Sequence, residues 1–146
     1  MSVSFRRGRP GDAASVFALC HQLGYQPDER GFDETFSQVV RHPEAAVFVA
    51  VLGAKTLGYL ALSYRPQIRL GGRTANIDEL VVAADQRGAG IGSSLLQTAL
   101  DHARSIGCLR VEIQTNRARE SYARRFYVAR GFTEADSALL RLEWKK

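Results

Sequence analysis

The chain contains short stretches of alternating or continuous apolar residues, and longer stretches with apolar residues three or four positions apart. The first pattern is typical of strands and the second of amphipathic helices. Strands are predicted over residues 2–7, 45–52, 56–64, 73–82, 108–114 and 137–144. Helices are predicted over residues 12–24, 33–42, 90–106 and 119–130. The pattern therefore predicts an α/β fold built in layers.

In chain order these elements read β-α-α-β-β-β-α-β-α-β, a mixed sheet with helices on its faces. The turn at residues 53–55 predicts a hairpin between the second and third strands. Asp12 and Asp33 are expected as N-caps of the first two helices. On the strand at residues 108–114, Leu109 and its alternate neighbours are expected to face inward.

The strand at residues 73–82 leads into a glycine-rich turn and then a long helix. Three glycines, Gly88, Gly90 and Gly92, separate the two elements. A strand, a glycine turn and a helix start direct unpaired amide groups and the positive end of the helix dipole toward one spot. This arrangement predicts an anion site, and phosphate is the first ligand to consider.

The spacing of the glycines distinguishes between kinds of phosphate site. A nucleotide P-loop requires Gly-Lys-Ser/Thr, but Gly92 is followed by Ser93. The dinucleotide fingerprint G-x-G-x-x-G does not match either. Residues 87–92 instead resemble the R-x-x-G-x-G signature of the GNAT superfamily of N-acetyltransferases. A second stretch, residues 123–132, resembles the A-x-x-F-Y-x-x-x-G-F element of the same superfamily.

The resemblance implies a GNAT-like fold over a single domain, residues 1–146. In such a fold a mixed, mostly antiparallel sheet with helices on both faces splays open beside its central strand. Acetyl-coenzyme A (acetyl-CoA) would bind in the gap as co-substrate, with the backbone of Leu80, Val81 and Val82 pairing with its pantetheine arm. The pyrophosphate would be held by the loop of Arg87, Gly88, Ala89, Gly90, Ile91, Gly92 and Ser93.

The resemblance also supplies candidates for proton transfer. Tyr127 occupies the family's Tyr position and would protonate the departing thiolate, since a phenol with a pKa of about 10 is protonated at neutral pH. The alternative is an aromatic residue that only packs. Glu79 would deprotonate the amine, and its alternative role is an ion pair with an arginine. Glu112 or a water molecule could serve as the base instead.

One position departs from the family pattern. An Asn that touches the pantetheine often stands about seven residues before the Tyr, where this chain has Glu120. Asn116 could take that role if the turn is longer, so both residues remain candidates. His21, His42 and His102 are expected at the surface, and no metal site is predicted.

Composition narrows the class of protein. The 146 residues are 45% hydrophobic and 24% charged, as in ordinary globular domains. No apolar run suggests a membrane span or signal peptide, and Cys20 and Cys108 are expected to be reduced, so a cytoplasmic protein is expected. The net charge of +5 raises a nucleic-acid-binding domain as an alternative, but the arginines are scattered.

The expected function is acetyl transfer from acetyl-CoA to a primary amine of a small molecule or peptide, by direct attack in a ternary complex. A non-catalytic acyl-CoA-binding regulatory module on the same fold is the alternative. The acceptor is expected between the first two helices and residues 65–72, with a lining from Tyr25, Asp28, Glu29, Asp33 and Glu34. The sequence leaves the oligomeric state open, and because edge strands could pair two copies, a homodimer is an alternative to a monomer.

Overall fold

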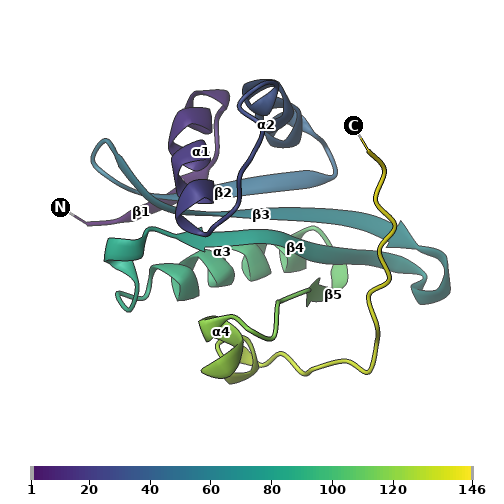
Figure 1. The fold of residues 1–146 in the computed structure, drawn as a ribbon. Coiled ribbons are helices and arrows are strands. Elements are labelled where there is room, and N and C mark those ends of the chain that lie inside the picture. Colours follow the sequence, from purple (N-terminus) through teal and green to yellow (C-terminus); the bar gives the residue numbers. More distant parts are fainter. Residues whose placement is uncertain (1, 146) are drawn as a thin grey trace. The chain divides into compact units, whose positions relative to one another are not determined.

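The computed structural model describes residues 2–145, apart from the side chain of residue 123. Backbone contacts divide the described chain into two compact units, with the division between residues 114 and 115 of the sequence. The first unit contains the sheet and the long helices (Figure 1). The second unit contains short helical turns and an extended C-terminal segment. That residues 1–146 form a single domain stays a prediction.

The first unit is built on a five-stranded sheet with the strand order β1-β2-β3-β4-β5. Its strands are β1 (Ser4–Arg7), β2 (Ala45–Leu52), β3 (Lys55–Gln67), β4 (Gly72–Val82) and β5 (Cys108–Ile113). Neighbouring strands from β1 to β4 are antiparallel, and β4 and β5 are parallel. The predicted mixed, mostly antiparallel sheet is confirmed, and so is the hairpin between β2 and β3.

Three helices cover the two faces of this sheet. Helices α1 (Ala13–Gln22) and α2 (Phe32–Arg41) lie on one face, and α3 (Ile91–Ser105) lies on the other (Figure 1). Short 3-10 turns lie between β1 and α1 (Pro10–Asp12), between β3 and β4 (Ile68–Leu70) and between β4 and α3 (Ala84–Gln86). The predicted layers are therefore confirmed for this unit.

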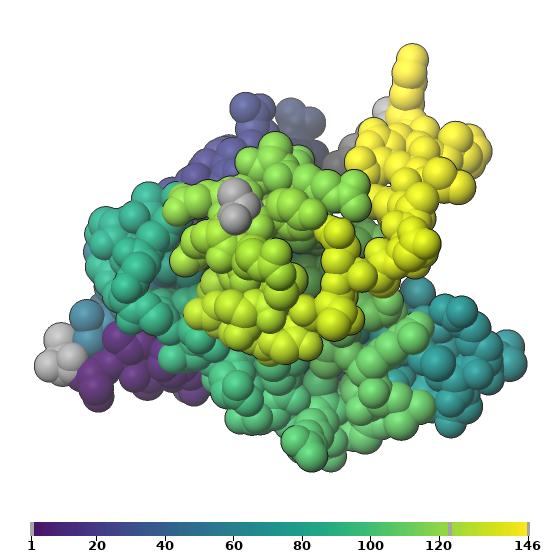
Figure 2. All heavy atoms as spheres, turned by 90° about the horizontal axis from the view of Figure 1, so that it is seen from below, coloured from purple at the N-terminus to yellow at the C-terminus, as the bar shows by residue number. Residues whose placement is uncertain are grey.

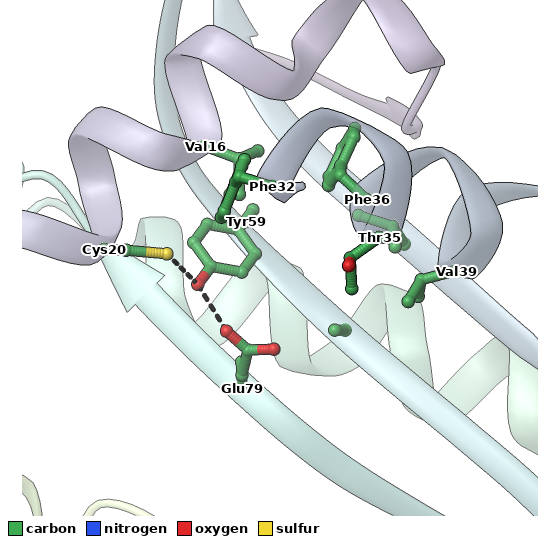
Figure 3. A pocket seen from close by; sticks show the side chains of 10 residues that line it. Val16, Cys20, Phe32, Thr35, Phe36, Val39, Tyr59 and Glu79 are labelled. Carbon is green, nitrogen blue, oxygen red and sulfur yellow. Dashed lines mark hydrogen bonds between the residues drawn. The ribbon is translucent and has the colours of Figure 1, made fainter. Parts of the chain in front are cut away.

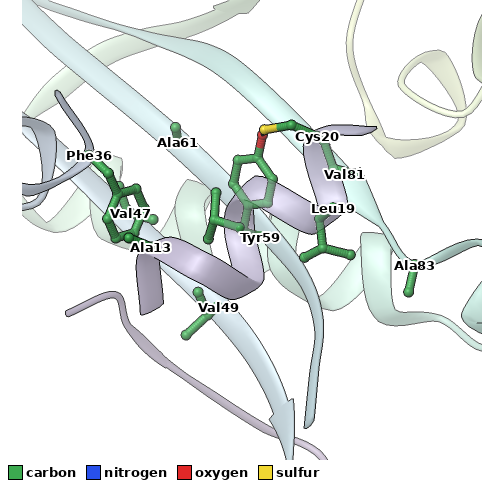
Figure 4. Close-up of a cluster of buried hydrophobic side chains, with 11 residues drawn as sticks. Ala13, Leu19, Cys20, Phe36, Val47, Val49, Tyr59, Ala61, Val81 and Ala83 are labelled. Atoms are coloured by element: carbon green, nitrogen blue, oxygen red, sulfur yellow. The ribbon is translucent and has the colours of Figure 1, made fainter. Parts of the chain in front are cut away.

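Both faces of the central strands are buried, which explains why β2 is apolar almost throughout. Under α1 and α2, Val47 and Val49 of β2 pack with Val16 and Leu19 of α1 and with Tyr59 of β3 (Figure 4). Under α3, the apolar helix positions Leu95, Leu96 and Ala99 are fully or almost fully buried. A strand covered on both sides shows a continuous apolar run instead of an alternation.

Several local predictions were wrong. Asp12 occupies the predicted N-cap position of α1, but its carboxylate makes no capping hydrogen bond to that helix and instead accepts two hydrogen bonds from the Arg6 guanidinium, both 2.9 Å long. Helix α2 begins after Gly31, whose positive φ of 75° places it as N-cap, and Asp33 lies in the first turn. Leu109 is 62% exposed, contrary to its expected inward orientation, and a register shift occurs where β5 begins to pair with β4.

The second unit differs most from the prediction. The expected helix over residues 119–130 is α4 (Glu120–Ala123) followed by a 3-10 turn at Val128–Arg130. Arg125 between them has a φ of 58°, a left-handed conformation that ends the α-helix.

The strand predicted over residues 137–144 is absent from the described chain, where these residues are irregular. The C-terminal segment is yellow in Figure 2. Its large apolar side chains are mostly exposed: Leu139, Leu140, Leu142 and Trp144. An apolar alternation forms a strand only where a neighbouring strand pairs with its backbone and a core covers one of its faces.

Candidate active site

Strand β4 extends beyond the end of its neighbour β5. The pairing between these parallel strands runs from Arg73–Cys108 to Ile77–Ile113, whereas β3 continues to pair with β4 up to Val82. Within the described residues, the stretch 78–82 therefore has a strand partner on its β3 side alone. Its other edge presents backbone amide and carbonyl groups that can pair with an extended ligand.

A β-bulge at Asp78 decides where Glu79 points. Ile77 lies opposite Leu62 and Glu79 lies opposite Ala61, so Asp78 is an extra residue in β4. Directly opposed residues share a face, and consecutive residues of β3 face opposite sides. Glu79 therefore faces α1 and α2, on the opposite side of the sheet from Ile77.

The loop after β4 leads into an uncapped start of α3. Gly88 and Gly90 have φ angles of 85° and 83°, in the left-handed region that glycine tolerates. Gly90 is the N-cap residue, no side chain caps the helix, and Ser94 N–H donates to the Gly90 carbonyl oxygen. The amide groups of Ile91 and Gly92 precede that hydrogen bond, so they lie where an anion would bind.

Open space surrounds this loop. A Cβ atom built on Gly88 or Gly90 would meet no heavy atom outside its immediate neighbours within 4 Å. Packing therefore does not require glycine here, and the positive φ angles do. The uncapped helix start and the space before it fit a pyrophosphate, with Arg87 exposed at the edge of the loop.

A cavity of about 90 Å³ lies between α1, α2 and the sheet (Figure 3). Most of its wall is apolar, and its aromatic side chains are Phe32 and Phe36 of α2 and Tyr59 of β3. Thr35, on the same helix, lines it as well. A cavity is therefore present beside the first two helices, where the acceptor was expected, but its lining contains none of the five acidic and aromatic residues expected from the sequence.

The polar end of the cavity is a chain of three side chains from different elements. The Tyr59 hydroxyl donates a 2.7 Å hydrogen bond to Oε1 of Glu79, and Cys20 Sγ lies 3.1 Å from that hydroxyl (Figure 3). Tyr59 is 2% exposed, and burial raises its pKa, with the nearby Glu79 carboxylate raising it further. Tyr59 therefore stays a neutral hydrogen-bond donor to Glu79.

Sequence reasoning singled out Glu79 but missed Tyr59. The alternation of β3 could have placed Tyr59 on the same face as Ala61. The bulge in β4, which brings Glu79 to that face, leaves no recognisable mark in the sequence. The predicted alternative for Glu79 was an ion pair with an arginine, whereas its hydrogen-bond partner here is a tyrosine.

Tyr127 lies in the second unit, within a cluster of aromatic rings. Its ring centroid is 4.9 Å from that of Phe126 and 5.8 Å from that of Phe132, both in edge-to-face geometry. Burial raises the pKa of Tyr127, and the charges of Arg119 and Arg124 partly offset this shift. The phenol is therefore protonated at neutral pH, as a proton donor must be.

The remaining candidates have local partners. Glu112 is exposed on β5, with its Oε1 3.5 Å from Nε of Arg110. Oδ1 of Asn116 accepts a 2.8 Å hydrogen bond from the Ala118 amide, and Glu120 is the first residue of α4. These contacts give Glu112 and Asn116 local structural roles.

His102 departs from the expected surface position. Its ring lies 5.4 Å from the Phe48 ring, and burial together with the charge of Arg7 lowers its pKa. Across residues 2–145, no three His, Cys, Asp or Glu side chains are grouped so as to hold a metal ion.

The glycine loop and the Phe-Tyr element agree with a family model. Residues 14–132 match the acetyltransferase (GNAT) family, so the match covers most of the chain and includes residues of both units. The chain belongs to this GNAT family. Acetyl transfer is therefore the general activity of the group to which this GNAT chain belongs.

Two named enzymes are similar to this GNAT chain in sequence. An aminoalkylphosphonate N-acetyltransferase from Salmonella typhimurium is 30% identical over 131 residues, which are 89% of this chain and 84% of that protein. A glucosamine 6-phosphate N-acetyltransferase from Oryza sativa subsp. japonica is 28% identical over 138 residues, with coverages of 88% and 81%.

A solved structure supports the GNAT fold. A transcriptional regulator from Bacillus halodurans C-125 superposes with a TM-score of 0.87 at 23% identity, covering 98% of this chain and all of that one. At this identity the likeness concerns the fold alone. In residues 2–145, no helix is both long enough and apolar enough to cross a membrane.

Proposed function

We propose that this chain transfers an acetyl group from acetyl-CoA to a primary amine, by direct attack of the amine on the thioester carbonyl in a ternary complex. The observation that carries this proposal is the free edge of β4 at residues 78–82, followed by the glycine loop and the uncapped start of α3. The family membership and the names of the two relatives support it.

The coenzyme would be held mainly by backbone groups. The stretch Leu80 to Val82 would pair with the pantetheine amides, and the loop from Arg87 to Ser93 would hold the pyrophosphate. Two observations support this assignment. The pairing of β4 with β5 ends at Ile77, so the edge of residues 78–82 on that side has no strand partner among the described residues, and no side chain caps α3. Asn116 would add a contact to the pantetheine through its amide nitrogen, because its Oδ1 already accepts a hydrogen bond from Ala118.

The side chains would move the protons. Glu79 would accept a proton from the ammonium form of the acceptor, directly or through water, which leaves a neutral nucleophilic amine. The nitrogen–carbon bond then forms, and the carbon–sulfur bond breaks with its electron pair on the sulfur, which Tyr127 would protonate. The extra proton on the new amide nitrogen would pass to water, and water would return a proton to the Tyr127 phenolate. A thiol, with a pKa of about 8.5, is a stronger acid than a phenol, with a pKa of about 10. The thiolate can therefore leave without being protonated, and proton transfer from Tyr127 would assist this step without being required.

The first experiment is a calorimetric titration of the wild type and Gly90→Glu with acetyl-CoA. The glutamate would place a side chain and a negative charge in the space before α3, where the pyrophosphate is proposed to bind. We expect at least about a hundredfold weaker binding, because the variant replaces an attraction by a repulsion at a helix N-terminus.

Gly107→Glu is the matched control. Gly107 follows the C-terminal end of the same helix, has the same φ of 83°, and also has no heavy atom within 4 Å of a built Cβ. The two variants therefore carry the same charge and similar backbone strain. Wild-type binding that is lost only in Gly90→Glu supports the proposal, whereas equal losses in both variants would point to general destabilisation. Absence of wild-type binding would overturn the proposed function.

A further inference from the structure

The cavity beside Glu79 is poorly suited to the acceptors that appear in the names of the two relatives. Both names describe amines that carry a phosphonate or phosphate group. We propose that the acceptor of this chain is a primary amine on a short, uncharged aliphatic chain, bound with its ammonium group at Glu79 and its carbon chain in the cavity. This proposal rests on the proposed function and specifies the acceptor.

The charges of the cavity wall favour a cation and disfavour an anion. Among the ten lining residues Glu79 is the one acidic side chain, and Lys, Arg and His do not occur. An ammonium group would pair with this carboxylate, whose second oxygen is left for a ligand because Oε1 accepts the Tyr59 hydroxyl. A phosphonate in the cavity would lose water and meet a negative charge without a counter-ion.

The wall of the cavity favours an apolar substituent. Phe32 and Phe36 stack with centroids 6.3 Å apart and ring planes 7° from parallel, and Phe17 packs edge-to-face on Phe32. Val16 and Val39 add further apolar groups to the helix side of the wall, where Thr35 and Cys20 are the polar side chains. The phenyl and isopropyl groups offer no hydrogen bonds to a sugar hydroxyl or a phosphate oxygen, so a substituent with several polar groups would lose hydrogen bonds to water on entering.

The size of the cavity limits the length of the chain. Its volume of about 90 Å³ is smaller than the roughly 150 Å³ apolar cavity that admits benzene. Since it is smaller than a cavity that admits benzene, we expect it to take a short chain of about three or four carbon atoms. Propylamine and butylamine therefore fit the inference, and a phenyl-bearing amine would exceed the space.

A homologous series tests this inference. The kcat/KM for thiol release is measured with ethylamine, propylamine, butylamine and hexylamine, and with 2-aminoethylphosphonate as the charged counterpart. We expect a rise of about fourfold for each methylene up to butylamine, because each buried methylene adds about 0.8 kcal/mol. We expect no further gain at hexylamine, and a lower kcat/KM for the phosphonate than for butylamine.

A pair of charge variants locates the selectivity in the cavity. Thr35→Arg introduces a cation from an exposed position of α2 that lines the cavity. Its ratio of phosphonate to butylamine kcat/KM should rise about tenfold, since a hydrogen bond to a charged group contributes about 1.5–3 kcal/mol. Gln97→Arg is the control, because it adds the same charge at an exposed position of α3 on the other face of the sheet.

Calorimetry with acetyl-CoA on the same preparations separates the two proposals. If the coenzyme binds and the phosphonate is the better acceptor, the aliphatic acceptor is overturned and the proposed function stands. The aliphatic acceptor is likewise overturned if kcat/KM is flat along the alkylamine series, or if Gln97→Arg changes the ratio as much as Thr35→Arg. If the coenzyme does not bind, both proposals fail.

Discussion

The coenzyme region and the acceptor cavity are built from different parts of the chain. Apart from the contact proposed for Asn116, the coenzyme region is one continuous stretch, residues 78–93, and it offers mainly backbone groups. The cavity is assembled from side chains on α1, α2, β2, β3 and β4, between residues 16 and 79. Backbone groups are the same in every sequence that folds this way, whereas the cavity changes with each substitution.

The two regions meet in β4 and should respond differently to mutation. A side-chain substitution that keeps the backbone in place, and neither fills nor charges the space before α3, should leave coenzyme affinity nearly unchanged, because the proposed contacts are made by amides and carbonyls. The same kind of substitution in the cavity should change turnover. A variant of the cavity that weakens coenzyme binding as strongly as turnover would break this distinction.

Glu79→Gln should have the largest effect. The amide is nearly isosteric with the carboxylate but cannot take the proton from the ammonium group, so we expect kcat to fall about a hundredfold or more. The Kd for acetyl-CoA should stay within about twofold, because the β4 backbone is unchanged. Steady-state kinetics and calorimetry on the same sample measure both quantities.

Glu112→Gln is the matched control for this prediction. Glu112 is an exposed carboxylate on a strand, like Glu79, but its contact is the surface ion pair with Arg110. A surface ion pair contributes little to stability, and Glu112 is not proposed to contact the acceptor, so kcat should stay within about twofold of wild type. A collapse of kcat in Glu112→Gln with normal turnover in Glu79→Gln would exchange the roles of the two residues.

Tyr127→Phe should have the next largest effect. Loss of the phenolic proton should lower kcat about tenfold to a hundredfold without a change in coenzyme affinity. Because the thiolate can leave without a proton, we expect a loss near the tenfold end of this range. Tyr122→Phe is the control, since that hydroxyl bonds to Glu134 within the same unit. Equal rates for Tyr127→Phe and wild type would remove Tyr127 from the mechanism.

The pH dependence sharpens the test of Tyr127. Burial raises its pKa above the ordinary value of about 10, so the wild-type phenol stays protonated through the neutral and mildly alkaline range. The ratio of wild-type to Tyr127→Phe kcat should therefore be constant between about pH 7 and pH 9 and fall toward one only above about pH 10. A ratio that already falls below pH 9 would contradict this assignment.

Sequence patterns were sufficient for the layers and for the glycine loop, because both depend on local periodicity and on residues close together in the chain. The presence of the first three helices and of the first five strands along the chain follows from apolar spacing, whereas the placement of helices on both faces of the sheet was implied by the family resemblance. Gly88 and Gly90 require positive φ angles, and that requirement is visible in the sequence.

Other features depend on contacts between distant residues. The capping role expected of Asp12 failed because its carboxylate pairs with Arg6 of β1. The helix expected around Tyr127 is interrupted at Arg125, a residue type that rarely adopts a positive φ. The cavity wall could not be predicted either, because the bulge at Asp78 decides which face Glu79 joins.

Tyr59→Phe should have the smallest effect and is the most direct test of how side chains build the acceptor region. The Tyr59 hydroxyl holds Oε1 of Glu79 at 2.7 Å, so its removal frees the carboxylate to take other orientations. We expect kcat to fall about fivefold, the size expected for one hydrogen bond, with little change in coenzyme Kd. Cys20→Ala removes the thiol on the other side of Tyr59 but keeps the bond to Glu79, so its kcat should stay within about twofold. If Tyr59→Phe retains the wild-type kcat while Glu79→Gln does not, the base functions without this support and Tyr59 serves only to pack the core.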